Sequence, residues 1–273
     1  MSHRAEVERL DRLGGKRRRA GDLSAADAAY RRALVIAETN LPARDPTTAR
    51  VRNNLAVVLK YSGGFDEAAA LYQRSLESLT ATLGANHPEV ATVLHNIGGL
   101  AHAAGRPAAG EGAAREAVRI REAALGRAHP ETAADRAALA AILDATGRHD
   151  EAAELLEDAL SIFEQAFGPD HHEVGVTLGN LGAIDARRGN LERAEPRLRR
   201  ALAIKEQSLG PNHIELVPTL GTLGVVCRRT GRAAEARQCY ERALRLLDGR
   251  VAADHPQVAA LKANIAKLGT PSS

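Results

Sequence analysis

Residues 83–106 have the sequence LGANHPEVATVLHNIGGLAHAAGR, and its pattern returns along the chain with a period of 42 residues. The histidine of the HP pair recurs as His87, His129, His171, His213 and His255. The glycine near the end recurs as Gly21, Gly63, Gly105, Gly147, Gly189 and Gly231. A fixed period of about 20–50 residues is typical of a repeat protein, in which each repeat buries its apolar face against its neighbours.

This period divides the chain into six full units and a shorter C-terminal segment. The units are 3–44, 45–86, 87–128, 129–170, 171–212 and 213–254. A half unit follows at 255–269, and a polar tail occupies 270–273. Because every unit keeps the same phase, we expect residues 1–269 to form a single array that ends in a capping helix.

Each unit is predicted to form two helices. Proline follows the histidine column at Pro88, Pro130 and Pro256, and Pro46 follows Asp45, which takes the place of histidine. Proline is tolerated at the first position of a helix, so the residue before it becomes the N-cap and accepts a backbone hydrogen bond. The glycine column predicts a left-handed turn where the first helix ends. The second helix should begin two residues later and end at Leu125, Phe167 and Leu209 in the third to fifth units.

These units resemble tetratricopeptide repeats of the kinesin light chain type. The segments that carry the resemblance are 83–106, YQRSLESLTATLGANHP at 72–88 and AEPRLRRALAIKEQSLGPNH at 194–213. The aromatic residue usual in the second helix is present as Tyr30, Tyr72 and Tyr240. The resemblance implies an all-α fold: a right-handed superhelical α-solenoid of six helix-turn-helix pairs plus the capping helix, with the first helices lining a concave groove. It also implies peptide binding or scaffolding rather than catalysis.

Composition narrows the class of protein further. The chain has 273 residues with 37 basic and 34 acidic side chains, and a net charge of +3 is too small to imply nucleic-acid binding by itself. No apolar stretch approaches the ~20 residues of a membrane helix, and the N-terminus lacks the apolar core of a secretory signal. With only two cysteines, a disulfide scaffold is excluded, and we expect a cytoplasmic protein. The high alanine, arginine and glycine content suggests a bacterial source.

The sequence predicts no enzyme, no cofactor and no metal site. Residues 105–112, GRPAAGEG, have the glycine spacing of a phosphate-binding loop but lack its lysine and its serine or threonine. Cys227 and Cys239 occupy columns that elsewhere hold leucine, so we expect them to be core residues. Equivalent histidines of successive units lie too far apart to share one ion, because packed helices are separated by about 8–10 Å.

The candidate binding residues follow from the resemblance, which places the exposed side of the first helices on the groove. They are Arg50, Asn53, Asn54, Lys60, His95, Asn96, His102, Asn180, Arg187, Arg228 and Arg229. In peptide-binding proteins of this family an asparagine at the position of Asn54, Asn96 and Asn180 clamps the ligand backbone. The alternative is that these amides form hydrogen bonds between neighbouring helices.

The charge of the expected groove favours an acidic ligand. Its basic positions are Arg12, Arg18, Arg19, Arg50, Lys60, Arg187, Arg228 and Arg229, and its acidic positions are Glu8, Asp11 and Asp144. The groove would therefore carry +5, more than the whole chain, and would attract an acidic peptide. An apolar anchor of that peptide could rest on an alanine floor formed by Ala134, Ala137, Ala138, Ala141 and Ala145.

Two other functions stay open at this stage. Nucleic acid could bind the basic groove and the cluster Lys16–Arg19, although Tyr61 is the one aromatic residue placed to stack on a base. The favoured explanation of this cluster is a solvated end of the solenoid. The chain could also self-assemble through its ends, but the half unit 255–269 is expected to act as a cap, which favours a monomer.

Two units contain irregularities. The second helix of the third unit includes Gly110 and Gly112, each of which costs about 1 kcal/mol relative to alanine, so we expect the array to be most mobile there. Pro218 lies several residues inside the first helix of the sixth unit. That helix should either begin late or bend.

Overall fold

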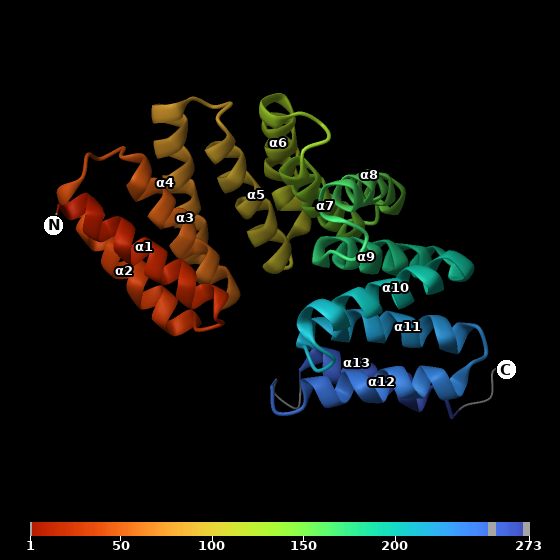
Figure 1. Ribbon diagram of the computed structural model, residues 1–273. Coiled ribbons are helices and arrows are strands. Elements are labelled where there is room, and N and C mark those ends of the chain that lie inside the picture. Colours follow the sequence, from red (N-terminus) through yellow and green to blue (C-terminus); the bar gives the residue numbers. More distant parts are fainter. Residues whose placement is uncertain (1, 251–254, 270–273) are drawn as a thin grey trace. The chain divides into compact units, whose positions relative to one another are not determined.

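The computed structural model describes residues 2–250 and 255–269, and within these ranges it contains only helices, turns and short connections (Figure 1). The α-helices are α1 (His3–Arg19), α2 (Leu23–Asn40), α3 (Pro46–Tyr61), α4 (Phe65–Leu83), α5 (Pro88–Ala103), α6 (Pro107–Leu125), α7 (Pro130–Ala145), α8 (His149–Phe167), α9 (His172–Arg188), α10 (Leu191–Leu209), α11 (Val217–Arg229), α12 (Ala233–Leu247) and α13 (Pro256–Ala266). A 3-10 turn, η1 (Ile214–Leu216), precedes α11. Residue 1, the last residues of the sixth predicted unit at 251–254 and the predicted tail at 270–273 lie outside the described residues.

The predicted all-α repeat fold is confirmed. Odd-numbered helices up to α11 are the first helices of the six units, even-numbered helices are the second helices, and α13 is the half unit. The second helices begin two residues after the glycine column, and α6, α8 and α10 end at Leu125, Phe167 and Leu209 as predicted.

The cap column sets where the first helices begin. The Nδ1 atom of His87 accepts a hydrogen bond from the backbone N–H of Glu89 at 3.2 Å, and His129, His171, His213 and His255 do the same two residues ahead. Asp45 caps α3 through Oδ1, which accepts from the Thr47 N–H at 2.8 Å. Aspartate and histidine are interchangeable here because each presents an acceptor to an orphan amide.

A glycine in the left-handed conformation follows each first helix, and most of these helices end two residues before it. Helix α3 ends at Tyr61, and Gly63 has a φ of +82°. The chain then folds back, so that the N–H groups of Ser62 and Gly64 donate to carbonyls of the last turn. Only a residue without a Cβ adopts this φ without strain, which explains why glycine is kept at this position in six units.

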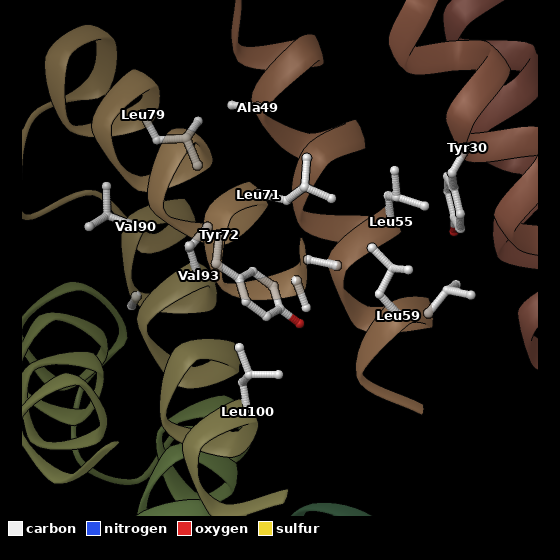
Figure 2. Packing of buried hydrophobic residues seen from close by; sticks show 14 of the residues in the cluster. Tyr30, Ala49, Leu55, Leu59, Leu71, Tyr72, Leu79, Val90, Val93 and Leu100 are labelled. Carbon is white, nitrogen blue, oxygen red and sulfur yellow. The ribbon is translucent and has the colours of Figure 1, made fainter. Parts of the chain in front are cut away.

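The described chain divides into two compact parts, each of which contains several of the repeats. We call them unit 1 (Met1–Arg148) and unit 2 (His149–Ser273), and from here on the 42-residue elements are called repeats. The core of unit 1 contains Tyr30, Leu55, Tyr72, Leu79 and Val90, which Figure 2 shows lying between successive helices. The core of unit 2 is built around Leu198, Leu223, Val226, Cys227 and Tyr240. Cys227 is fully buried and Cys239 half-buried against this core, as predicted.

Small residues allow the two helices of a repeat to approach closely. A Cβ at Gly14 would lie 2.7 Å from the Tyr30 ring, and one at Gly182 would lie 2.6 Å from Leu198 Cγ. Both separations are far below van der Waals contact, so glycine is required where a large side chain of the second helix packs on the first.

Helix α11 begins late, which is one of the two outcomes that Pro218 predicted. His213 still caps the start of the repeat, but the chain first makes the 3-10 turn η1, and the α-helix begins at Val217 with Pro218 in its first turn. Proline is accepted there because its missing N–H has no acceptor within the helix.

Candidate functional site

All eleven candidate binding residues lie on first helices, but they belong to two separate sets. Seven lie on α3 and α5 of unit 1, and four lie on α9 and α11 of unit 2. Helices α1, α3, α5 and α7 pack side by side in unit 1, and α9 packs beside α11 in unit 2. We call the exposed side of these helices, with that of α13, the first-helix face.

In unit 1 the asparagines link neighbouring first helices. Asn54 Nδ2 donates to Asp11 Oδ1 of α1 at 2.9 Å, and Asn96 Nδ2 donates to Asn53 Oδ1 of α3 at 2.9 Å. Asn53 is buried and donates in turn to Asn54 Oδ1 at 3.4 Å. These are the inter-helix bonds that the sequence left open. Asn180 on α9 is exposed, and ligand clamping by the asparagine column stays a prediction.

A small recess lies beside these amides. Its volume is about 170 Å³, and its lining includes Arg50, Asn53, Asn54, Glu89 and Thr92. The side chain of Arg50 is exposed and lies 3.5 Å from Thr47 Oγ1. The recess therefore offers amide, hydroxyl and charged groups at the amino-terminal half of α3.

His95 is held by a buried ionic cluster. Its Nδ1 lies 2.8 Å from Asp135 Oδ1 on α7, and Asp135 Oδ2 accepts from Arg121 Nε on α6 at 3.0 Å. Arg121 also binds Glu131 at 2.9 Å. Arg121 and Asp135 occupy the positions that the apolar residues Leu79 and Val93 occupy one repeat earlier. That paired departure from the apolar columns is the signal that sequence reasoning missed.

The remaining candidates of unit 1 lie near the carboxyl-terminal ends of α3 and α5. His102 is exposed, whereas Lys60 is half-buried with its Nζ 5.0 Å from the centroid of the Tyr61 ring. Burial, and then the positive charge of Arg18, lower the pKa of Lys60. On α7, four alanines of the predicted floor are half-buried, and Ala145 is exposed; the four are Ala134, Ala137, Ala138 and Ala141.

In unit 2 the first-helix face contains a larger pocket of about 460 Å³. Its lining comes from α9, α11 and α13, and comprises Ala183, Ala186, Arg187, Val217, Pro218, Gly221, Thr222, Val225, Arg229, Gln257, Ala260, Leu261 and Asn264. The structure thus brings Arg187 and Arg229 together around one cavity. Both are exposed, and Arg229 Nη1 donates to the Ala186 carbonyl at 2.5 Å. Arg228 is half-buried.

Sequence reasoning did not predict this pocket. Three residues of its lining, Arg187, Pro218 and Arg229, stood out in the sequence, but none of them indicated a cavity. Val217 and Pro218 reach the pocket wall because α11 begins at Val217, and that start depends on the local geometry of η1.

Neither a metal-binding cluster nor a membrane-spanning helix is found among the described residues. Residues 2–250 and 255–269 contain no group of three or more histidine, cysteine, aspartate or glutamate side chains placed to hold a metal ion. Within the same ranges, no helix combines the length and the apolar character that crossing a bilayer requires.

A family model for the tetratricopeptide repeat matches four overlapping stretches of the chain, 47–123, 89–165, 137–207 and 173–249. No curated protein sequence matches. Among solved structures, nearly identical TPR-like repeats from Podosopora anserina, described as a kinesin light chain, are 22 % identical with a TM-score of 0.62, covering 77 % of this chain and 99 % of theirs.

Two further solved structures share the fold. BtubC (BKLC) from P. vanneervenii is 20 % identical with a TM-score of 0.63, covering 90 % of this chain and 91 % of its own. A Rap protein complexed with Competence and Sporulation Factor is 12 % identical with a TM-score of 0.69, covering 98 % of this chain and 76 % of its own. At these identities the likeness concerns the arrangement of helices.

Proposed function

Because the chain belongs to the tetratricopeptide repeat family, we propose that it is a non-enzymatic scaffold whose first-helix face binds an extended, acidic segment of a partner protein. The structure supports a role in protein–protein interaction through its stacked helix pairs, which leave one side of each first helix exposed. The two cysteines are not joined by a disulfide, which is compatible with a location in the cytoplasm, where thiols stay reduced.

The observation that carries the acidic ligand is the pocket of unit 2. Its walls are largely apolar, with Val217, Val225 and Leu261 among them, and Arg187 and Arg229 bring two positive charges to it. Binding pockets typically combine apolar walls with a few polar groups that orient the ligand. A leucine-sized side chain flanked by aspartate or glutamate matches this combination of volume and charge.

A structural neighbour adds support for ligand binding by this architecture. The Rap protein of similar fold was solved in complex with Competence and Sporulation Factor. We therefore expect the exposed first helices of this chain to receive a ligand as well, with specificity set by its own side chains.

Fluorescence anisotropy with three labelled peptides tests the proposal. The peptides are an acidic peptide with a central leucine, the same peptide with glycine for leucine, and a basic peptide with the leucine retained. The acidic leucine peptide should bind more tightly than the other two at low salt. Equal binding of the basic peptide would refute the charge argument.

Variants of the pocket localise the binding. Replacing Arg187 and Arg229 together by alanine should weaken the acidic leucine peptide by about tenfold, equivalent to about 1.4 kcal/mol. Arg237→Ala is the matched control because Arg237 is exposed on α12 and lies outside the pocket lining. Gly221→Leu should fill the pocket and remove the preference for leucine, since a Cβ there meets only Leu261 Cδ2 at 3.8 Å.

The asparagine clamp is a separate part of the proposal. Asn180→Ala should weaken peptide binding without changing the melting temperature, because the side chain is exposed. Asn54→Ala should change both, because its amide also bonds Asp11. If Asn180→Ala binds the peptide as the wild type does, Asn180 is no clamp.

A further inference from the structure

The small recess of unit 1 contains a carboxylate oxygen without a partner. Glu89 lines this recess of about 170 Å³. Its Oε2 atom is buried, and within residues 2–250 and 255–269 no hydrogen bond reaches it. Burying a polar atom without a hydrogen bond costs free energy, and the cost is larger for a charged group. A donor that enters the recess removes this cost.

The next repeat shows how this glutamate is satisfied from within the chain. Glu131 follows Glu89 by one period of 42 residues, and its Oε2 lies 2.9 Å from Arg121 Nη1. Arg121 is buried on α6, where its Nε donates to Asp135 at 3.0 Å and its Nη2 to Thr92 at 3.1 Å. One guanidinium group therefore binds three side chains at this place in the repeat.

The recess occupies the equivalent place one repeat earlier. Its lining includes the four residues that precede Thr92, Arg121, Glu131 and Asp135 by one period, namely Arg50, Leu79, Glu89 and Val93. Leu79 and Val93 belong to the apolar core (Figure 2), and neither side chain has a polar atom. The second repeat thus keeps the acid and a recess, but it lacks the guanidinium that the third repeat supplies.

Unit 2 contains another basic residue in the column of Leu79. This residue, Lys205, is buried, and its Nζ donates at 3.3 Å to Thr219 Oγ1, in the column of Val93. Burial lowers the pKa of Lys205, and the charge of Glu215, in the column of Glu89, raises it. A buried basic side chain therefore recurs at the position where the second repeat has leucine.

The other polar residues of the recess do not satisfy Glu89. Arg50 is exposed, and its Nη2 lies 3.5 Å from Thr47 Oγ1, while Glu89 Oε2 has no donor. The amide oxygens of Asn53 and Asn54 already accept hydrogen bonds, from Asn96 and Asn53 respectively. Glu89 is therefore the acceptor that the lining offers to a ligand.

We propose that the recess binds a guanidinium group from outside this chain, with the Glu89 carboxylate as its acceptor, in the place that Arg121 fills one repeat later. A guanidinium fits better than an ammonium because its planar donors match a carboxylate in pairs. An arginine of a partner protein and a free guanidino compound both present this group. The affinity of the recess for it does not depend on the proposed function.

NMR of the full chain with labelled leucine and valine methyl groups tests the recess directly. Methylguanidinium should shift the signals of Leu79 and Val93 and give nuclear Overhauser effects to both, and methylammonium should act more weakly. Leu198 and Val226, in the core of unit 2, serve as internal controls. No change at Leu79 and Val93, or equal changes at the control residues, would overturn the proposal.

Two glutamate variants of the same column identify the acceptor. Glu89→Gln keeps the shape of the side chain and should weaken methylguanidinium binding by about tenfold. Glu131→Gln is the matched control, because Glu131 lies outside the recess lining and pairs with Arg121. It should leave methylguanidinium binding unchanged. Binding that is the same in Glu89→Gln as in the wild type would show that Glu89 is not the acceptor.

A third variant supplies the guanidinium from within. Leu79→Arg reproduces the arrangement of Arg121, so the folded variant should no longer bind methylguanidinium. Leu79 is fully buried, and circular dichroism establishes whether the variant folds. Binding that persists in the folded variant would contradict the proposed position of the ligand. If the variant does not fold, the comparison of Glu89→Gln with Glu131→Gln decides the question.

Peptides distinguish the two sources of the guanidinium. The acidic leucine peptide is compared with the same peptide extended by arginine, on the wild type and on Glu89→Gln. A gain in affinity that requires both the arginine and Glu89 assigns the recess to a partner protein. Methylguanidinium binding without such a gain assigns it to a free guanidino compound. If neither peptide binds while methylguanidinium does, the proposed function fails and the recess proposal stands.

Discussion

At most repeat boundaries a single side chain decides where a first helix begins, and His213 caps the turn η1 that precedes α11. The five cap histidines and Asp45 all accept from the N–H two residues ahead, although a carboxylate and an imidazole differ in size and charge. The position requires a side-chain acceptor atom that can reach the backbone N–H two residues ahead. This requirement is local, and for that reason the cap was predictable from the sequence.

Replacing a cap histidine should measure this contribution. We expect His129→Ala to lower the free energy of unfolding by about 1 kcal/mol, because the Glu131 N–H loses its acceptor at the helix start. His129→Asp should retain most of the stability, since aspartate performs the same task at Asp45. Urea denaturation of the three proteins provides the comparison, and equal loss in both variants would contradict the capping role.

At the scale of helices, the packing between the two helices of a repeat gives two glycines with the same low helix propensity different roles. Gly110 and Gly112 both lower the helix propensity of α6. A Cβ at Gly110 would lie 2.8 Å from both Ala101 Cβ and the Gly98 carbonyl oxygen, whereas a Cβ at Gly112 meets nothing within 4 Å. Gly110 therefore permits the contact between α5 and α6, and Gly112 only weakens the helix.

These two glycines should respond to alanine in opposite ways. Gly112→Ala should raise the free energy of unfolding by about 1 kcal/mol through helix propensity. Gly110→Ala should lower it by about 1–3 kcal/mol because the two helices are forced apart. Thermal unfolding gives the sign of each change.

Hydrogen exchange in the wild type should also be faster at 107–116 than at 150–165, and exchange that is no faster would argue against a mobile third repeat.

Ion pairs that Glu195 of α10 forms with Arg199 and Arg232 add a stabilisation that depends on pH. A hydrogen bond from Arg232 and, with a smaller effect, one from Arg199 lower the pKa of Glu195 to about 2 from an ordinary value of 4.5. Because the pKa is lower in the folded protein, this stabilisation is complete above about pH 4.5 and is lost as the pH falls through 2.

Glu195→Gln tests this contribution. It should lower the free energy of unfolding at neutral pH by about 1 kcal/mol or less, the range of exposed ion-pair networks. The difference from the wild type should shrink as the pH falls from 4.5 to 2. Glu192→Gln is the control, since Glu192 is exposed on the same helix. A difference that stays constant over this pH range would show that the ion pairs contribute nothing.

At the scale of the whole molecule, the family and the exposed first helices favour a single chain that acts on a partner. We expect sedimentation to give the mass of one chain across a wide range of protein concentration. A mass that grows with concentration would instead favour self-assembly through the ends. Absorbance at 260 nm that persists through purification and disappears at high salt would favour nucleic-acid binding.

The sequence by itself determined the repeat length, the helix pairs, the caps and the turn glycines, because each depends on residues within a few positions of one another. The resemblance to tetratricopeptide repeats placed the candidate binding residues on the first helices, and their role in binding stays a prediction. Tertiary structure decided the rest. The pocket around Arg187 and Arg229 and the pairing of Asn54 with Asp11 depend on how side chains of different repeats approach in space. A period of 42 residues places these positions in register, but the distances between their polar atoms follow only from the packing of the helices.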